Sequence, residues 1–257
     1  MENINYVIYS HTDYLDILKI HLDYSKFFNK TLIINKTRDI SDIIHEFDKV
    51  IYYDDTKPYA ERLYTSLKEI DSEIILFTHD MDIPISYDNN FIIKLQKQMV
   101  EENIHRIDLQ QDVNASKNES IRNDLSNVRI DELTLIKNNN INNYIYNVNP
   151  SLWNRRSFIE ILSNYKNETY RSIELSNIQS TCLNYNIFKC HHNGSLKLGW
   201  FFVTPVYKYL HMTHSGKFLP IQNNMNGLDQ DTQNIYQTII SKFNLLGGNR
   251  EFSSSLF

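Results

Sequence analysis

Four short apolar segments alternate with helical patterns over the first 82 residues, and this alternation constrains the fold more than any other feature. The segments cover residues 6–9, 31–34, 49–53 and 73–77. The intervening residues 14–28, 40–47 and 58–70 carry apolar side chains at helical spacing. Near-continuous apolar strands separated by helices are typical of a parallel sheet buried on both faces. The sequence therefore predicts an α/β fold with a mostly parallel sheet flanked by helices.

Polar side chains follow three of these four segments. Ser10 and His11 come after the first, Asp55 after the third, and Asp80 and Asp82 after the fourth. The carboxyl ends of parallel strands meet at one edge of a sheet, and ligands of such folds bind there. We therefore expect these side chains to converge on one site.

Asp80 and Asp82 flank a single residue directly after a buried strand. Both carboxylates can face one hard cation, and Mg²⁺ or Mn²⁺ prefers oxygen ligands. Such a cation neutralises substrate phosphates and acts as a Lewis acid on a leaving diphosphate. The same pattern also occurs in solvated turns of acidic chains; the apolar strand before it favours the metal site.

A second cluster lies at residues 211–217 and contains His211, His214 and Lys217. An imidazole after a late strand can complete the coordination of the metal, and Lys217 can meet a phosphate as a point charge. We expect His214 to be the ligand, because it lies nearer the glycine-containing turn. The alternative is a surface turn whose two histidines are hydrogen-bonded locally.

Two further positions, Trp153 and Glu174, are expected at or near the starts of helices, over residues 152–165 and 170–184. Trp153 can stack on a sugar face or pack in the core. Glu174 can act as a general base on an acceptor hydroxyl, or it can simply complement a helix dipole.

Tyr59 and Arg62 lie one turn apart on the helix that follows Asp55. Arg62 can reach a phosphate, and Asp55 can accept a hydrogen bond from a base or a ribose. The alternative is an exposed Tyr–Arg pair with Tyr59 in the core.

Composition excludes several classes. With 26 Lys and Arg against 31 Asp and Glu, the net charge is −5, which disfavours a dedicated nucleic-acid binder. The Gly-rich and metal motifs of dinucleotide enzymes, P-loop enzymes, serine hydrolases and zincins are absent from the sequence. No secretory signal and no membrane span is recognisable, so we expect a cytoplasmic enzyme. The two cysteines, Cys182 and Cys190, are expected to be free thiols.

Residues 57–64 and 73–82 together resemble GT-A glycosyltransferases, especially those of bacterial surface-polysaccharide clusters and large DNA viruses. In that group a helix bearing an Arg precedes a strand that ends in an acidic metal motif. Residues 149–156 with Glu174 are similar to the acceptor-side segment of the group, and residues 211–217 to its C-terminal His/Gly/Lys turn. The resemblance spans roughly residues 4–220.

The chain is rich in Asn, Ile, Tyr and Lys, a bias typical of AT-rich genomes. In a viral protein, the site of action would be the host cytoplasm.

The resemblance implies transfer of a sugar from a nucleotide-diphosphate donor, commonly a UDP-sugar, to a glycan or glycoconjugate acceptor. The metal, Mn²⁺ or Mg²⁺, would be held by Asp80, Asp82 and His214, and Glu174 would be the base. The expected donor-binding residues are Ser10, His11, Asp55, Tyr59, Arg62, Asp80 and Lys217, and the expected acceptor-binding residue is Trp153.

We expect one catalytic domain over residues 1–257. Residues 1–110 would bind the nucleotide-sugar, residues 111–246 would face the acceptor, and residues 247–257 would form a flexible tail. The sequence leaves a homo-oligomer open.

Two other functions share parts of this pattern. A nucleotidyltransferase has a similar αβ start and acidic pair, but it usually carries a Gly-rich loop after the first strand. Residues 10–14 contain no glycine, which argues against that reading. A non-catalytic glycan-binding or scaffold domain with the same fold is the third reading, because fold alone does not establish function.

Overall fold

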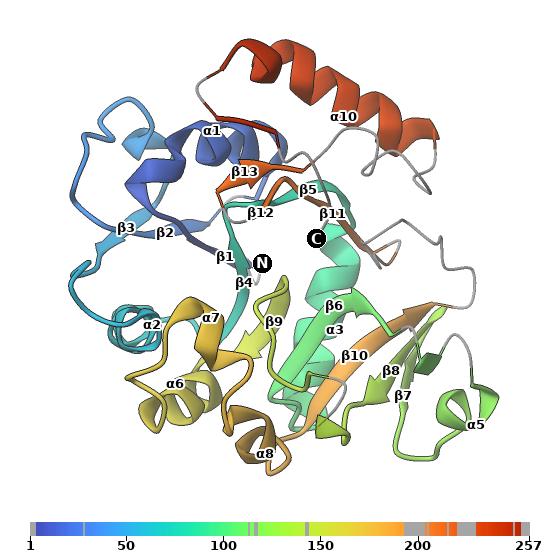
Figure 1. The fold of residues 1–257 in the computed structure, drawn as a ribbon. Coiled ribbons are helices and arrows are strands. Elements are labelled where there is room, and N and C mark those ends of the chain that lie inside the picture. The colour runs from blue at the N-terminus through green and yellow to red at the C-terminus, as the bar shows by residue number, and fades with distance from the viewer. Residues whose placement is uncertain are drawn as a thin grey trace.

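A computed structural model describes residues 4–27, 29–112, 114–115, 118–141, 144–192, 204, 206–214, 216–219, 230–248 and 250–252. In this part of the chain, a nine-stranded sheet has the order β3-β2-β1-β4-β9-β6-β10-β8-β7 (Figure 1). Its strands are β1 Asn5–Tyr9, β2 Lys30–Ile34, β3 Lys49–Tyr52, β4 Ile74–His79, β6 Arg106–Gln111, β7 Val128–Ile130, β8 Leu133–Lys137, β9 Ser151–Asn154 and β10 Ile187–His192.

Two small strand pairs lie beside this sheet: β5 Asp82–Tyr87 with β11 Tyr207–His211, and β12 Thr213–His214 with β13 Lys217–Phe218. The helices are η1 Thr12–Tyr14, α1 Leu15–Tyr24, η2 Ile44–Glu46, α2 Tyr59–Lys68, α3 Asn89–Glu101, α5 Glu119–Arg122, α6 Arg155–Ser163, α7 Tyr170–Ile173, α8 Ile178–Cys182, α10 Gln230–Lys242 and η4 Leu245–Gly247.

The sheet is mostly parallel, which confirms the expected α/β class. Strands β3, β2, β1 and β4 all run parallel. Strand β9 runs antiparallel to both of its neighbours, β4 and β6, and β10 is again parallel to β6. Among the described strands of this sheet, β9 and β8 alone run the opposite way. The carboxyl ends of β1, β2, β3 and β4 therefore share one edge.

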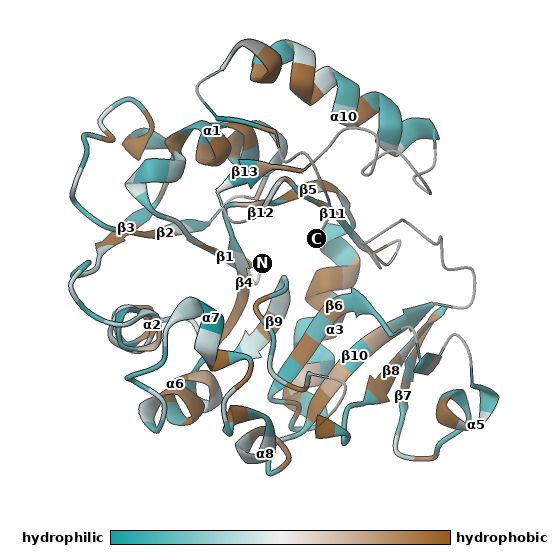
Figure 2. Cartoon of the chain, in the orientation of Figure 1, coloured by the Kyte–Doolittle hydropathy of each residue, from teal (hydrophilic) through white to brown (hydrophobic). Residues whose placement is uncertain are grey.

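The sheet is covered on both faces, because successive side chains of a strand point to opposite sides. In β1, Tyr6 and Ile8 belong to one apolar cluster and Val7 and Tyr9 to the other. Helices α1, α3 and α10 pack in the first cluster, and α2, α6 and α8 in the second. The helices carry apolar residues beside polar ones, as Figure 2 shows for α1 and α10.

Residues 151–154 are the main correction to the expected elements. Ser151–Asn154 forms strand β9, and the helix expected from residue 152 begins only at Arg155. The side chain of Asn154 caps that helix by accepting from the Ser157 N–H. Two open strand edges, on β4 and β6, take up this segment, so tertiary pairing overrides its helical pattern.

Other expectations differ more mildly from the structure. Only a short η2 turn forms within residues 40–47, which carry apolar side chains at helical spacing, and residues 144–148 form no strand. The expected boundary at residue 110 falls inside β6, so strands from both parts of the chain lie in one sheet. The expected strand at residues 199–203 lies outside the described residues.

Residues 250–252, within the expected tail, contact other elements of the chain. Arg250 forms two hydrogen bonds with the carboxylate of Asp16, each 2.9 Å, and donates to the carbonyl of Gly216. The Phe218 N–H donates to the carbonyl of Glu251. The end of the described chain is thus joined to α1 and β13.

Within the described ranges, no helix combines the length and the apolar character needed to cross a bilayer. Cys182 and Cys190 are buried free thiols, as the sequence predicts.

Replacing Arg250 by Met should lower the free energy of unfolding by about 1–3 kcal/mol, because it removes charge-assisted hydrogen bonds from a guanidinium that is only 15% exposed. Urea denaturation measures the loss. The matched control is Lys217→Met, which removes an exposed ion pair with Glu251 and should change stability little. Equal losses in both variants would contradict the anchoring role of Arg250.

Candidate functional site

Asp80 lies directly after β4, beside the end of β1. Its N–H donates to the carbonyl of Tyr9, and its Oδ2 accepts from the Ser10 hydroxyl at 2.5 Å. The residue is only 3% exposed. Burial, helped by the charges of Asp82 and Asp16, raises the pKa of the Asp80 carboxyl to about 7, against the hydrogen bonds from Ser10 and the Met81 N–H. Asp80 is therefore a carboxyl poised to hold or release a proton near neutrality.

Asp82 opens strand β5, and its partner in register on β11 is His211. The Nδ1 of His211 donates to Asp82 Oδ1 at 2.7 Å. Asp82 is 3% exposed, so two buried carboxylates flank Met81. The histidine expected beside this pair was His214, but the structure brings His211 to it. The backbone of His214 pairs with Lys217 in the β12–β13 hairpin, and its side chain lies outside the described residues.

Two buried histidines hold backbone carbonyls near the end of β4. Nδ1 of His21 donates to the carbonyl of Asp80, and Nδ1 of His79 to that of Val148. Each ring accepts a tyrosine hydroxyl at Nε2, from Tyr6 and Tyr59 respectively. Burial lowers the pKa of both imidazoles to about 4, so both are neutral at pH 7. They orient the backbone around the acidic pair without adding charge.

Glu174 was expected near the start of a longer helix, but it directly follows the short helix α7. Its Oε1 accepts from the Val148 N–H at 2.8 Å, and its Oε2 has no hydrogen-bond partner in the described part of the chain. Burial raises the pKa of Glu174 and the charges of Asp108 and Asp82 add to the rise, although the Val148 hydrogen bond and Arg106 oppose it. Glu174 is thus within electrostatic reach of Asp82.

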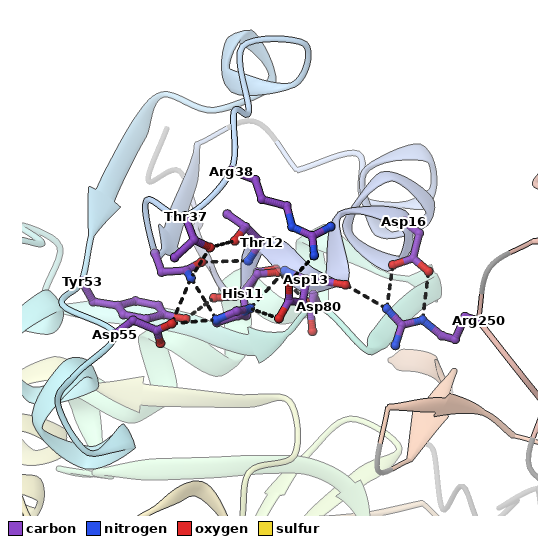
Figure 3. Close-up of polar contacts among 12 residues, drawn as sticks. His11, Thr12, Asp13, Asp16, Thr37, Arg38, Tyr53, Asp55, Asp80 and Arg250 are labelled. Atoms are coloured by element: carbon purple, nitrogen blue, oxygen red, sulfur yellow. Dashed lines mark hydrogen bonds and ion pairs between the residues drawn. The ribbon is translucent and has the colours of Figure 1, made fainter.

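A polar network joins the ends of β1, β2 and β3 (Figure 3). His11 accepts from the Asp13 N–H at Nδ1 and therefore donates from Nε2 to Asp55 Oδ2, at 3.0 Å. Asn35 donates to the same oxygen, and Arg62 pairs with Asp55 Oδ1 at 2.8 Å. Burial alone would raise the pKa of Asp55, but the hydrogen bond from His11 and the charge of Arg62 hold it below its usual value. The structure thus brings His11, Asp55 and Arg62 together.

Two expected ligand contacts do not fit their surroundings. Trp153 is 1% exposed on β9, where its ring stacks on Phe158 at 4.2 Å between centroids and lies against Arg106. It therefore packs in the core and has no face for an acceptor sugar. Tyr59 is 5% exposed and its hydroxyl is bonded to His79, so it too is a core residue.

Lys217 lies on the exposed side of the β12–β13 hairpin, where its Nζ pairs with Glu251 at 2.8 Å. Arg38 pairs with Asp13 in the loop after β1, and Arg250, from the segment adjacent to β13, is a second cation beside that loop. It bonds Asp16 and the carbonyl of Asp13, and Asp80 contributes to the raised pKa of its guanidinium (Figure 3). No sequence pattern points to Arg250, because it lies in a polar segment with no periodicity.

A buried ion pair supports the segment that carries Val148. Arg106 and Asp108 of β6 are both fully buried, with Nη2 and Oδ2 3.7 Å apart. Arg106 donates to the carbonyls of Ile145 and Asn147, and Asn147 Nδ2 donates to Asp108. This network replaces strand pairing for residues 144–150 and fixes the backbone to which Glu174 is bonded.

Near the end of β4, Ser10 bonds Asp80 and His211 bonds Asp82, and Glu174 and Tyr170 lie within electrostatic reach of Asp82. In the described ranges, no group of three or more His, Cys, Asp or Glu side chains is arranged to hold a metal by itself. Two carboxylates without a third protein ligand suit Mg²⁺, which usually keeps water and substrate phosphates as its other ligands. The arrangement can also accept a proton, at Glu174.

No family model matches the sequence, and a search of curated proteins finds no match. Among solved structures, the S. aureus TarS fragment 1–349 has a TM-score of 0.46 and 10% identity, over 74% of this chain and 58% of that one. The structure of UDP-glucose pyrophosphorylase complexed with UDP-glucose has a TM-score of 0.42 and 14% identity, over 74% of this chain and 90% of that one. The bifunctional IspDF from Campylobacter jejuni has a TM-score of 0.38 and 12% identity, over 71% of this chain and 47% of that one. The chain therefore spans about half the length of TarS 1–349 and of IspDF. At these identities and TM-scores, likeness assigns no reaction to the chain.

The raised pKa of Asp80 predicts a pH-dependent stability difference between the metal-free wild type and Asp80→Asn. Between pH 4 and 7 the unfolded chain has lost this proton, since its ordinary pKa is 3.8, whereas the folded chain keeps it to about 7. The free energy of unfolding of the wild type therefore falls as pH rises through this window. Asp80→Asn lacks this contribution, because its amide does not titrate. The stability of Asp80→Asn relative to wild type should rise by at most about 4 kcal/mol and level off above pH 7.

Urea denaturation in a chelator, at pH 4, 5, 6, 7 and 8, measures this difference. The control is Asp71→Asn, whose fully exposed carboxyl should give a flat difference. A flat or falling profile for Asp80→Asn would show that Asp80 is ionised throughout.

Proposed function

We propose that this protein is a metal-dependent glycosyltransferase. It would move a sugar from a nucleotide-diphosphate donor, probed first as a UDP-sugar, to a hydroxyl of a glycan or glycoconjugate. The observation that carries the proposal is the buried carboxylate pair Asp80 and Asp82 at the carboxyl edge of a parallel sheet, with Glu174 in electrostatic reach.

The residues present fit a divalent cation. Asp80 and Asp82 are both 3% exposed, and burial, together with the charge of Asp82, raises the pKa of Asp80. Asp80 and Asp82 would hold the cation, whose charge would offset that of the two carboxylates. When bound, Mn²⁺ or Mg²⁺ supplies charge neutralisation to the leaving diphosphate. His211 would orient Asp82; His214 stays a proposed third ligand from the sequence.

The order of the strands supports a direction for the donor. Asp55 and His11 lie at the ends of β3 and β1, Asp80 lies at the end of β4, and Glu174 lies beyond it. A nucleotide-sugar laid along this edge would place its nucleoside near Asp55 and its diphosphate near Asp80. Its sugar would then lie toward Glu174. Arg62 is held by Asp55 and would shape the nucleoside end rather than reach phosphate.

Glu174 is the proposed base. The acceptor oxygen forms a bond to the anomeric carbon as the bond from that carbon to the diphosphate oxygen breaks. The acceptor proton passes to Glu174, and the bonding electrons leave with the diphosphate. A carboxylate whose pKa is raised by burial accepts a proton more readily, and the Val148 N–H fixes the orientation of Glu174.

Thermal denaturation with a ligand panel tests the proposal. The panel is UDP-glucose, UDP-N-acetylglucosamine, GDP-mannose, their nucleoside diphosphates, and UTP, each with and without Mn²⁺. A ligand at about 100 times its dissociation constant adds about 2.7 kcal/mol of stability. Metal-dependent stabilisation by a nucleotide-sugar, lost in Asp82→Asn but kept in Asp71→Asn, is the expected result. Preference for UTP over every sugar nucleotide would favour a nucleotidyltransferase, and no stabilisation at all would favour a non-catalytic domain.

Asp82→Asn should also abolish sugar transfer while its melting temperature, without ligand, stays near that of the wild type, because Asn is isosteric and can still accept from His211. Transfer of radiolabelled sugar to acceptor or to water measures the activity. Large destabilisation with unchanged activity per folded molecule would contradict the role of Asp82 in metal binding.

Glu174→Gln should lower kcat at least about 100-fold and leave donor affinity nearly unchanged, because the amide keeps an acceptor for the Val148 N–H but cannot take a proton. Steady-state kinetics and donor titration measure the two effects. The matched control is Glu168→Gln, which lies in the same segment and bonds Ser172. Parallel losses of kcat and affinity would assign Glu174 to binding instead.

A further inference from the structure

Tyr170 lies at the centre of the candidate site, although no sequence pattern marks it. It is the first residue of α7, and its hydroxyl donates to the sulfur of Met81 at 3.9 Å. Met81 is the residue between the two buried carboxylates. The ring centroid of Tyr170 lies 5.2 Å from that of Tyr59 and 5.3 Å from that of His79. Tyr170 therefore packs over the end of β4.

The exposure of Tyr170 sets it apart from these aromatic neighbours. It is 37% exposed, whereas Tyr59 is 5% and His79 is 2% exposed. Both neighbours meet its ring nearly at right angles, at 88° and 79°, and in the described part of the chain no ring stacks parallel on it. Tyr170 is therefore partly accessible at the site, whereas its two aromatic neighbours are enclosed in the core.

Three carboxylates act on the same hydroxyl. Burial against the protein raises the pKa of Tyr170 well above its usual value, and the charges of Asp82, Glu174 and Asp80 raise it further. The phenol is therefore neutral at every physiological pH, and it lies within electrostatic reach of the acidic side chains. A binding group here would meet one apolar surface surrounded by hydrogen-bond acceptors.

We propose that Tyr170 is the platform on which the sugar of the donor packs, an inference that rests on the proposed glycosyltransferase function. A pyranose presents C–H groups on its faces and hydroxyls around its rim. The exposed ring of Tyr170 matches the apolar part, and the carboxylates near it match the hydroxyls, in the way ligand sites combine aromatic walls with a few polar groups. Tyr170 thereby contributes to recognition of the sugar and not of the nucleotide.

The test separates the sugar from the nucleotide. Dissociation constants are measured by calorimetry, with Mn²⁺, for UDP and UDP-glucose, for UDP and UDP-N-acetylglucosamine, and for GDP and GDP-mannose. The proteins are the wild type, Tyr170→Phe, Tyr170→Ala and the control Leu175→Ala, whose side chain is 73% exposed in the same segment. The affinity gained by adding the sugar to the nucleoside diphosphate is compared between proteins.

In the wild type, one sugar nucleotide should bind more tightly than its diphosphate. Tyr170→Ala should cut this gain about tenfold while its affinity for the diphosphate stays the same, and Tyr170→Phe and Leu175→Ala should keep the gain. Unchanged diphosphate affinity also shows that the Ala variant is folded.

Two results overturn the inference and are distinguishable. If the wild type gains affinity from the sugar and Tyr170→Ala keeps that gain, or loses diphosphate affinity equally, Tyr170 is structural and the proposed function stands. If the wild type binds no sugar nucleotide, the proposed function fails and the inference fails with it.

Discussion

The backbone of Val148 joins the two halves of the candidate site. Its carbonyl accepts from His79, at the end of β4, and its N–H donates to Glu174, beside α7. The segment around it forms no strand and depends on Arg106, which is fully buried and donates to two backbone carbonyls of this segment. Because a buried ion pair is costly unless its hydrogen bonds are complete, this segment has little freedom to rearrange. The spacing between the acidic pair and Glu174 follows from these contacts.

Neutral polar groups, rather than cations, surround the acidic pair. His21 and His79 are uncharged at pH 7 because burial lowers the pKa of each to about 4. Arg62 is engaged by Asp55, and Arg250 by Asp16. When Asp80 and Asp82 are both ionised, they create a negative potential in a buried region. Such a potential favours a cation, and it would disfavour a diphosphate that arrived without one.

The parallel half of the sheet was predictable because local pattern and tertiary position agree there. Strands β1 to β4 are apolar on both faces, and polar residues such as Ser10 and Asp80 follow them. Prediction failed where pairing decides: residues 151–154 have a helical pattern but fill the gap between β4 and β6. It also failed for His211, since only the register of β11 on β5 brings that ring to Asp82. Tyr170 could not be found, because its role depends on packing across 89 residues of sequence.

The bond between Asp16 and Arg250 spans 234 residues of the chain. During synthesis the first strands and α1 are made early and can begin to pack, but the guanidinium that compensates Asp16 is added much later. Until then, Asp16 lacks this cation at the start of α1, where its charge acts on Asp80, whereas Asp13 can already pair with Arg38. A growing chain that has not reached residue 250 would therefore present α1 with the charge of Asp16 still uncompensated. The electrostatics at the start of α1 thus depend on how far translation has proceeded.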